Sequence, residues 1–545
     1  MVFTLQRYIF REAFKVFVLA AVALTLMMSL GSILRPVQEY GVGPRQVVHL
    51  MGYFLPITLT FVLPMAALFA AALVYGRFAN DNELDACRAS GISLLTLVYP
   101  GLALAIMVAI VNLILSFHVV PAFVHLAQKS LKADAKQILF RNIQRRGYYE
   151  LPPDKQYRIY ADQANSRNDT LSGIVITEVK ENKIKNIITA ESARVHFSPH
   201  EKFSEVQIMA HNTHQMGSEE EGWFFMEWLP LTKQFPSLLG DDIKFKKIDE
   251  MKKIRLDLMR FYPIEELARD AYAQFTIELL AEDIAAKIAS DTKGDEAPSP
   301  DDTSRFYKLH NDATLVEFTA GSCSLKDEKK VELSGEVVAV ESDLVSKKPL
   351  RTSRCTKALL HIEGDELAPT LTMELYSAAW QRADGSEGLA GRQVIRGLTL
   401  PPAVKDKFKT ADVLKTVHPD STVSALQEGP SPKLQAMQSK LSRKIRKTLA
   451  EIKAEIHTRL VFGIGCVTLI MIGIGLGIIL KGGHLLTAFG VSSVPAGMLI
   501  VCIMMGKNIT KNFGARAGSG IVLMWGGLAF LSIFAVVIYR KLLKN

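Results

Sequence analysis

The stretch YFLPITLTFVLPMAALFAAALVYGRFANDNELDACRASGIS, residues 53–93, decides the fold class of this chain. It contains no Asp, Glu, Lys or Arg before Arg77. A helix needs about 20 such residues to cross the ~30 Å hydrocarbon core of a bilayer. After Arg77 the sequence is polar for a short distance and then becomes apolar again. This pattern is typical of two membrane spans joined by a short polar connection.

The same pattern recurs along the chain. Six stretches lack every charged side chain: 16–34, 46–76, 89–128, 460–480, 482–506 and 517–539. One such stretch would fit a buried helix of a soluble protein, but six predict a helical membrane protein. The first could instead be a cleaved signal peptide, but it is long for one and has no clear cleavage site, so we interpret it as a span. We expect two groups of three spans, at about 14–34, 53–76, 94–119, 460–480, 486–506 and 519–539.

The composition excludes several other classes of protein. Charged residues make up 22% of the 545 residues, which excludes wholesale disorder, and 36 Gly and 22 Pro are too few for a collagen-like chain. Five cysteines exclude a disulfide-dense scaffold. The net charge of +9 indicates acidic partners, namely nucleic acid, anionic lipid or a phosphate-bearing substrate. The membrane spans favour lipid, so we expect no nucleic-acid partner.

Charged residues at the two ends of the chain predict its orientation. The first and last spans are flanked by Arg7, Arg11, Lys15, Arg540, Lys541 and Lys544. Basic flanks of this kind stay in the cytoplasm. With six spans, the 77–93 connection is then also cytoplasmic, and the polar block between the two groups of spans lies on the outer side.

Two short connections on the outer side are basic, which runs against this rule. Their charged residues include only one acid, Glu39. The excess is either scatter in a statistical rule or a set of cations that face the phosphates of an anionic lipid. We favour the second interpretation, which makes these residues the candidate lipid-phosphate site: Arg35, Arg45, Lys507, Lys511 and Arg516.

The polar block between the spans contains two β-rich regions, 147–230 and about 306–400. Both alternate β-branched and aromatic residues with polar ones, between turn signals. Strands with one apolar face must stack to bury it, so we expect a sandwich or an open jelly roll. Between the two regions, 249–288 is predicted to be helical and 290–305 to be a mobile charged linker. A helix over 433–459 is predicted to lead into the fourth span.

The two β regions resemble each other. The first region aligns with the second over LSGIVITEVKENKIKNIITAESARVHF (171–197) and LSGEVVAVESDLVSKKPLRTSRCTKALLHI (333–362). The likeness is either a true repeat or chance similarity between strands. A repeat predicts a second β module over 306–400, either separate or merged into one enlarged sheet, and a register slip of one residue would reverse its inward face. The alignment sets Ile174, Ile176 and Val179 against Glu336, Val338 and Glu341.

Sequence patterns for catalysis are missing. The chain has no phosphate-binding G-x-x-x-x-G-K-[ST], no H-E-x-x-H, no G-x-S-x-G and no C-x-x-C. We therefore expect no enzyme activity, no catalytic residue, no cofactor and no metal site in this chain. Cys323 and Cys355 could form a disulfide in an oxidising compartment. Nothing else in the outer block is built on disulfides, so we favour two free thiols.

The connection after the second span predicts a short helix of its own, over about 80–91. Asn80 can cap its start, and Glu83 three residues later completes an approximate capping box. Gly91 suits the left-handed conformation at its end. A plain turn would need no such caps. The acidic residues of this helix lie near its N-terminus, where the helix dipole favours them.

The 53–93 stretch resembles the signature of the LptF/LptG permeases of lipopolysaccharide export. RYIFREAFK (7–15) is similar to the start of these proteins, and AEIHTRL (454–460) is similar to the start of their fourth span. The resemblance covers both groups of spans and, more loosely, 150–230. It implies a multi-pass protein of the cell inner membrane, with a periplasmic β-jellyroll between the third and fourth spans.

The resemblance also implies a function. The chain would be a permease subunit of an ATP-driven extractor that moves lipopolysaccharide from the outer leaflet of the inner membrane to a periplasmic β-jellyroll bridge. The short helix would be a coupling helix that contacts the ATPase through Glu83, Asp85 and Arg88. Arg35 matches a basic residue that lines the lipid cavity. The implied partners are lipopolysaccharide, a second LptF/LptG-type permease, a dimeric cytoplasmic LptB-like ATPase and an LptC/LptA-like bridge protein.

The outer block is longer than is usual in that family, and 306–400 looks like a bridge repeat. Two alternatives stay open: a different ATP-linked permease with a large outer domain, and a non-transporting membrane anchor for an outer binding module. An F-like and a G-like identity are both open. We divide the chain into spans 1–3 with the coupling helix (1–128), the jellyroll (129–250), a helical segment and linker (251–305), the second β module (306–400), a linker and helix (401–458), and spans 4–6 (459–545).

Overall fold

The structure is a computed structural model. It describes all residues except 1, 41–43, 134, 152–156, 181–182, 200–202, 218–223, 237–241, 292–305, 327–329, 364–369, 408–411, 481–484, 513–516 and 545. The chain forms two compact units. One unit consists of Met1–Tyr262 and Arg446–Asn545, and the other of Pro263–Ile445.

Within the described residues, six helices are long and apolar enough to span a membrane. Three precede the β-sheets and three follow them, so the prediction of two groups of three spans is confirmed. After α4, a single π-helical turn (Leu115–Val119) leads into α5 (Val120–Ala133). The spanning helices are α1 (Val2–Tyr40), α2 (Pro44–Asn80), α4 (Leu94–Ile114), α12 (Pro432–Ile479), α13 (Leu485–Asn512) and α14 (Ala517–Lys544).

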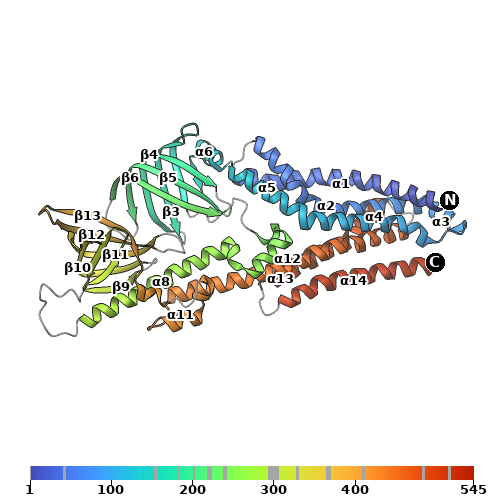
Figure 1. Cartoon of the computed structure of the whole chain (residues 1–545). Helices are drawn as coiled ribbons and strands as arrows, with labels where there is room; N and C mark the ends of the chain where they lie inside the picture. Colours follow the sequence, from blue (N-terminus) through green and yellow to red (C-terminus); the bar gives the residue numbers. More distant parts are fainter. Residues whose placement is uncertain are drawn as a thin grey trace. The chain divides into compact units, whose positions relative to one another are not determined.

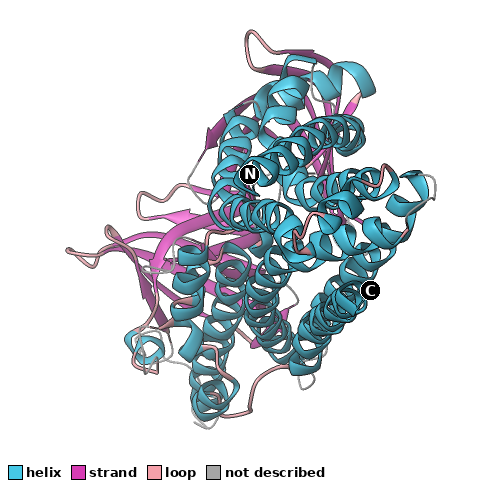
Figure 2. Ribbon diagram, turned by 90° about the vertical axis from the view of Figure 1, so that its right-hand side faces the viewer, coloured by secondary structure: helices cyan, strands magenta, loops and turns pink. Residues whose placement is uncertain are grey.

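Small residues let the spanning helices pack closely. A Cβ on Gly477 of α12 would lie 2.7 Å from the carbonyl oxygen of Ala72 in α2, so the two backbones nearly touch there. Close approach of this kind is how helices associate in lipid, where burial of apolar surface provides no driving force. Both chain termini lie at the same end of the bundle (Figures 1 and 2). That placement is the one expected for six spans.

The connection between the second and third spans contains α3 (Glu83–Ala89), which is shorter than the predicted helix over 80–91. The predicted capping box is wrong. Asn80 is the last residue of α2, and the N-cap is Asn82, which makes no side-chain capping hydrogen bond. The reason is tertiary: Phe78 and Ala79 are buried in the bundle core, which keeps α2 helical past the predicted boundary. Gly91 has a φ of 83° and ends the helix as predicted.

Sheet 1 follows α6 (Ala135–Arg146) in the first unit (Figure 1). Its six strands are antiparallel and pair in sequence order, so the described strands form a meander. The Greek-key connections of a jelly roll do not occur among them, because each strand pairs with its neighbours in the chain. One face is apolar and is covered in part by Leu139, Phe140 and Ile143 of α6. The strands are β1 (Tyr148–Glu150), β2 (Tyr157–Asn165), β3 (Thr170–Lys180), β4 (Lys183–Pro199), β5 (Phe203–Gly217) and β6 (Phe224–Pro236).

Sheet 2 is a separate antiparallel sheet in the second unit. The long helix α8 (Tyr262–Asp291) fills its apolar face with Phe275, Ile277, Leu280 and Ile284. The predicted linker 290–305 lies outside the described residues from residue 292 on. The strands are β7 (Tyr307–His310), β8 (Thr314–Thr319), β9 (Ser322–Lys326), β10 (Lys330–Asp343), β11 (Pro349–Glu363), β12 (Thr370–Arg382) and β13 (Glu387–Thr399).

Short helices occupy the remaining segments. After sheet 1 come a 3-10 turn (Ile243–Phe245), α7 (Ile248–Leu256) and a second 3-10 turn (Leu258–Arg260). After sheet 2 come α9 (Pro402–Lys405), α10 (Val413–Thr416) and α11 (Pro419–Ala425). Cys323 and Cys355 are free thiols. The Cys323 Sγ lies 3.8 Å from the Ala281 carbonyl oxygen on α8, and burial raises the pKa of this thiol to about 11.

Each sheet has a row of positions at which the regular pairing of the strands is interrupted, and the two rows lie at matching places in the two sheets. In sheet 1 the ladder skips Gly173 on β3 and Asn212 on β5, with φ values of 62° and 50°. In sheet 2 it skips Gly335 on β10 and Ser377 on β12, with φ values of 90° and 51°. Irregularities of this kind bend a strand. In each sheet the first irregularity directly follows a Leu-Ser pair, and the second lies two strands further along the chain. This shared placement favours a true repeat over chance similarity.

The predicted alignment of the two repeats is wrong by one residue. The register of β10 against β11 shifts between Ser334 and Val337. Two residues of β10 are therefore unpaired there, whereas β3 has one unpaired residue at the corresponding place. The buried side chains that correspond to Ile174 and Ile176 are therefore those of Val337 and Ala339, and not those of Glu336 and Val338. A bulge changes which face each following residue points to, because side chains alternate along a strand.

Candidate functional site: an ionic cluster at the start of the fourth span

Two helices face each other with charged residues spaced four apart. On α12 these are Glu451, Glu455 and Arg459, and on α13 they are Lys507 and Lys511. A spacing of four places side chains on one face of a helix. The Lys507 Nζ lies 2.6 Å from Glu455 Oε2, and the Lys511 Nζ lies 3.2 Å from Glu451 Oε1. The pairs form a short ladder between the fourth and fifth spans.

Arg459 connects this ladder to two other parts of the first unit. Its side chain is 4% exposed. Its Nε donates to Glu455 Oε1 at 3.2 Å, and its Nη2 donates to the carbonyl oxygens of Lys244 and Lys246 at 2.8 and 3.3 Å. The guanidinium carbon also lies 5.6 Å from the ring centre of Phe117, in the π-helical turn after α4. Arg459 therefore holds the fourth span against the third span and against the segment that leaves sheet 1.

One donor of Arg459 is unused. Its Nη1 is buried and has no hydrogen-bond partner within the described part of the chain. A buried, unpaired donor is costly, and in native proteins it calls for an explanation such as a ligand or an ion. The cluster contains three cations, Arg459, Lys507 and Lys511, against two carboxylates, so it has one positive charge in excess. Its chemistry suits an anion.

Neighbouring contacts fix the geometry of the cluster. A Cβ on Gly506 would lie 2.5 Å from the Gly520 carbonyl oxygen, so α13 and α14 touch beside Lys507. The Trp525 Nε1 of α14 donates to His457 Nδ1 of α12 at 3.2 Å. Burial alone would raise the pKa of Asp242, but the charge and hydrogen bonds of Lys244, together with the charge of Lys511, lower it below its ordinary value. Asp242 therefore stays ionised beside the cluster.

The structure places two of the five predicted lipid-phosphate residues in this cluster. Lys507 and Lys511 come together there, each with a carboxylate partner from α12. Arg516 lies outside the described residues, and so do the side chains of Arg35 and Arg45. Sequence reasoning missed Arg459, Glu455 and Glu451. The signal for them was available: acids and a base repeat every four residues directly before an apolar run.

The three predicted coupling residues lie on α3. Glu83, Asp85 and Arg88 are exposed, while Leu84 between them is buried in the helix bundle. Arg77 at the end of α2 donates to Glu12 of α1 at 3.3 Å and fastens the same end of the bundle. The helix is thus held by Leu84 and by the partly buried Cys87, and it presents its charges outward. Among the described residues, no group of three His, Cys, Asp or Glu side chains is placed to hold a metal ion.

Comparison with known proteins identifies the first half of the membrane part. Residues 7–268 match the family described as lipopolysaccharide export system permease LptF/LptG. The matched range contains α1, α2, α3, α4 and sheet 1, whereas sheet 2 and α12–α14 lie outside it. No curated protein matches the chain. Residues 7–268 contain three spans, the short helix between the second and third spans, and the sheet that follows them. This part of the chain is similar to the LptF/LptG family of lipopolysaccharide export permeases, which are components of a membrane transporter.

Proposed function

We propose that the chain is a permease subunit of an ATP-driven lipopolysaccharide extractor in the cell inner membrane, with its β-sheets in the periplasm. The family match supports this proposal, because it covers three spans, α3 and sheet 1 in one continuous range. The lipid would pass from the outer leaflet to the apolar face of sheet 1, and from there to an LptC/LptA-like bridge protein. A second LptF/LptG-type permease would complete the transporter.

ATP hydrolysis would take place in a separate, dimeric LptB-like subunit. The exposed charges of Glu83, Asp85 and Arg88 on α3 suit docking to such a subunit. A membrane anchor needs no contact with an ATPase, so the exposed helix between the second and third spans argues against the anchor alternative. A different ATP-linked permease is less well supported, because the matched range joins the spans directly to a sheet with an apolar face.

The cations at the outer ends of the spans would receive the phosphates of the lipid. Arg459 Nη1 and the excess positive charge of its cluster support this role. Lys507 and Lys511 would share the phosphates with their carboxylate partners, since both are already paired. Arg35, Arg45 and Arg516 would complete the rim of the lipid cavity.

Co-purification tests this function. The full chain, expressed in its own cell envelope and purified in detergent, is expected to retain a second permease and an ATPase. Arg88→Glu is expected to reduce the bound ATPase, because it reverses a charge at a partly desolvated interface, where truncating one partner costs about 2–5 kcal/mol. The matched control is Arg260→Glu, an exposed arginine outside the spans. A chain that retains no ATPase, or an Arg88→Glu variant that retains all of it, contradicts the coupling role.

A further inference from the structure

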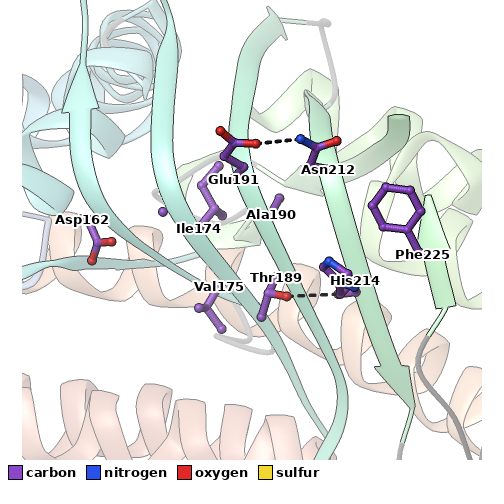
Figure 3. A pocket seen from close by; sticks show the side chains of 10 residues that line it. Asp162, Ile174, Val175, Thr189, Ala190, Glu191, Asn212, His214 and Phe225 are labelled. Atoms are coloured by element: carbon purple, nitrogen blue, oxygen red, sulfur yellow. Dashed lines mark hydrogen bonds between the residues drawn. The ribbon is translucent and has the colours of Figure 1, made fainter. Parts of the chain in front are cut away.

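In each sheet, one face has a groove at the row where the strand pairing is interrupted. The sheet 1 groove has a volume of about 700 Å³ and is lined by Asp162, Glu191, Asn212, His214 and Phe225, among others. The groove of sheet 2 has a volume of about 450 Å³ and lies at the same row, beside Gly335 and Ser377. Figure 3 shows the sheet 1 groove, with Asp162 at one side, Glu191 and Asn212 on adjacent strands, and Phe225 at the other side.

The charged groups of the sheet 1 groove are the carboxylates of Asp162 and Glu191, which accept hydrogen bonds. The Glu191 carboxylate accepts from Asn212 Nδ2 at 2.6 Å, which leaves its second oxygen for a ligand (Figure 3). Asp162 faces Gly173, where a Cβ would lie 2.1 Å from Asp162 Oδ2. Among the described residues that line this groove, none is Lys or Arg. Its two carboxylates repel phosphate and accept hydrogen bonds from hydroxyl groups.

Two exposed aromatic side chains stand beside these acceptors. Phe225 is 61% exposed and Trp228 is 56% exposed. The Phe225 ring centre lies 5.2 Å from that of His214, and the Trp228 ring centre lies 4.5 Å from that of His211. The irregularity at Asn212 puts both histidines on the same face, because Thr213 between them points into the buried side. Large exposed aromatic rings grouped on one face mark a binding surface.

We infer that the sheet 1 groove binds the neutral saccharide part of the glycolipid, an inference that rests on the proposed function. A saccharide presents hydroxyl groups around the ring and apolar C–H groups on its faces. The hydroxyls donate to Asp162 and Glu191, and a sugar face packs on Phe225 or Trp228. An apolar surface with a few placed polar groups is the usual form of a small-molecule site.

Sheet 2 provides an internal comparison. Its groove arises from the same bend, but its lining is Gly335, Glu336, Arg354, Cys355, Thr356 and Ser377. No aromatic residue is among these described lining residues, and an arginine stands beside the glutamate. The bend therefore explains the hollow in both sheets, but it does not explain the aromatic and acidic lining of sheet 1. That lining is the feature that points to a ligand.

Titration of the purified full chain in detergent tests the inference. The probes are the delipidated oligosaccharide of lipopolysaccharide, lipid A without its sugar chain, inorganic phosphate and an extended peptide, each followed by calorimetry. We expect the oligosaccharide to bind, and Phe225→Ala and Glu191→Gln each to weaken it about tenfold or more. Both residues are exposed, so the fold is retained. Glu336→Gln and Ser377→Ala in sheet 2 are the matched controls and are expected to bind as the parent does.

Each other outcome overturns the inference. These outcomes are no binding of oligosaccharide, equal binding by the parent and the sheet 1 variants, and a peptide or phosphate that binds in its place. ATP-dependent extraction of lipid A separates this result from the proposed function. If the groove alone is misassigned, the complex still extracts lipid A. If the proposed function is wrong, the complex extracts no lipid, whatever the oligosaccharide does.

Discussion

Glu455→Gln tests the ionic cluster at the start of the fourth span. The substitution keeps the shape of the side chain but removes the charge that faces Lys507 at 2.6 Å and Arg459 at 3.2 Å. The side chains of Glu455 and Arg459 are 9% and 4% exposed, so water cannot replace the lost partner. Removing one partner of a buried pair costs about 3–5 kcal/mol. Because the amide oxygen still accepts one hydrogen bond, we expect about 3 kcal/mol.

The free energy of unfolding in mixed micelles, titrated with denaturing detergent, measures this effect. The matched control is Asp257→Asn, whose carboxylate pairs with Arg260 while both side chains are more than half exposed. An exposed pair contributes about 0–1 kcal/mol, so the control should change little. The double variant Glu455→Gln/Lys507→Gln should lose less than the sum of the two single losses, because the two residues share one interaction. A loss below 1 kcal/mol for Glu455→Gln would refute the reasoning.

Two further predictions concern the β-sheets. Gly173→Ala should destabilise sheet 1 by about 1–3 kcal/mol, because φ is 62° and the new Cβ would meet Asp162; Gly526→Ala, with open space around it, is the control, and equal unfolding of the two variants would contradict the bend. Burial raises the pKa of Glu374, but hydrogen bonds from Arg392 and Tyr376 outweigh it and lower that pKa. A lowered pKa contributes stability above about pH 4.3, the ordinary value for Glu, and this stability is lost as the pH falls through the folded value. Unfolding measured from pH 6 to 3 should therefore depend less on pH in Glu374→Gln, and an unchanged profile would contradict the assignment.

The spans were predictable because lipid imposes a simple requirement. A helix that crosses the bilayer needs a long run without charges, and such a run is visible in one dimension. The strands of both sheets were also visible, since their alternation reflects one buried face. The end of α2 was not, because the burial of Phe78 and Ala79 overrides the local preference of Asn80 for a cap.

The partners of the cations were not predictable from their own connection. Lys507 and Glu455 are 52 positions apart, so the connection at 507–516 looked purely basic. The one-residue error in the repeat has a similar origin. Glu336 is an extra residue in the β10 irregularity, and only the pairing of β10 with β11 reveals it. The packing of α8 against the apolar face of sheet 2 also depends on contacts between distant segments. This packing buries Val337 fully.

Lipid cross-linking along β3 is the most direct test of lipid transfer to sheet 1. A photo-reactive side chain replaces Ile176, which lies on the apolar face, or Thr177, the next residue on the other face. The full transporter is reconstituted in vesicles with lipopolysaccharide labelled in its acyl chains. The account predicts labelled adducts at position 176 that require ATP, and few or none at position 177. Equal adducts at both positions, or adducts at 176 that do not depend on ATP, would contradict it.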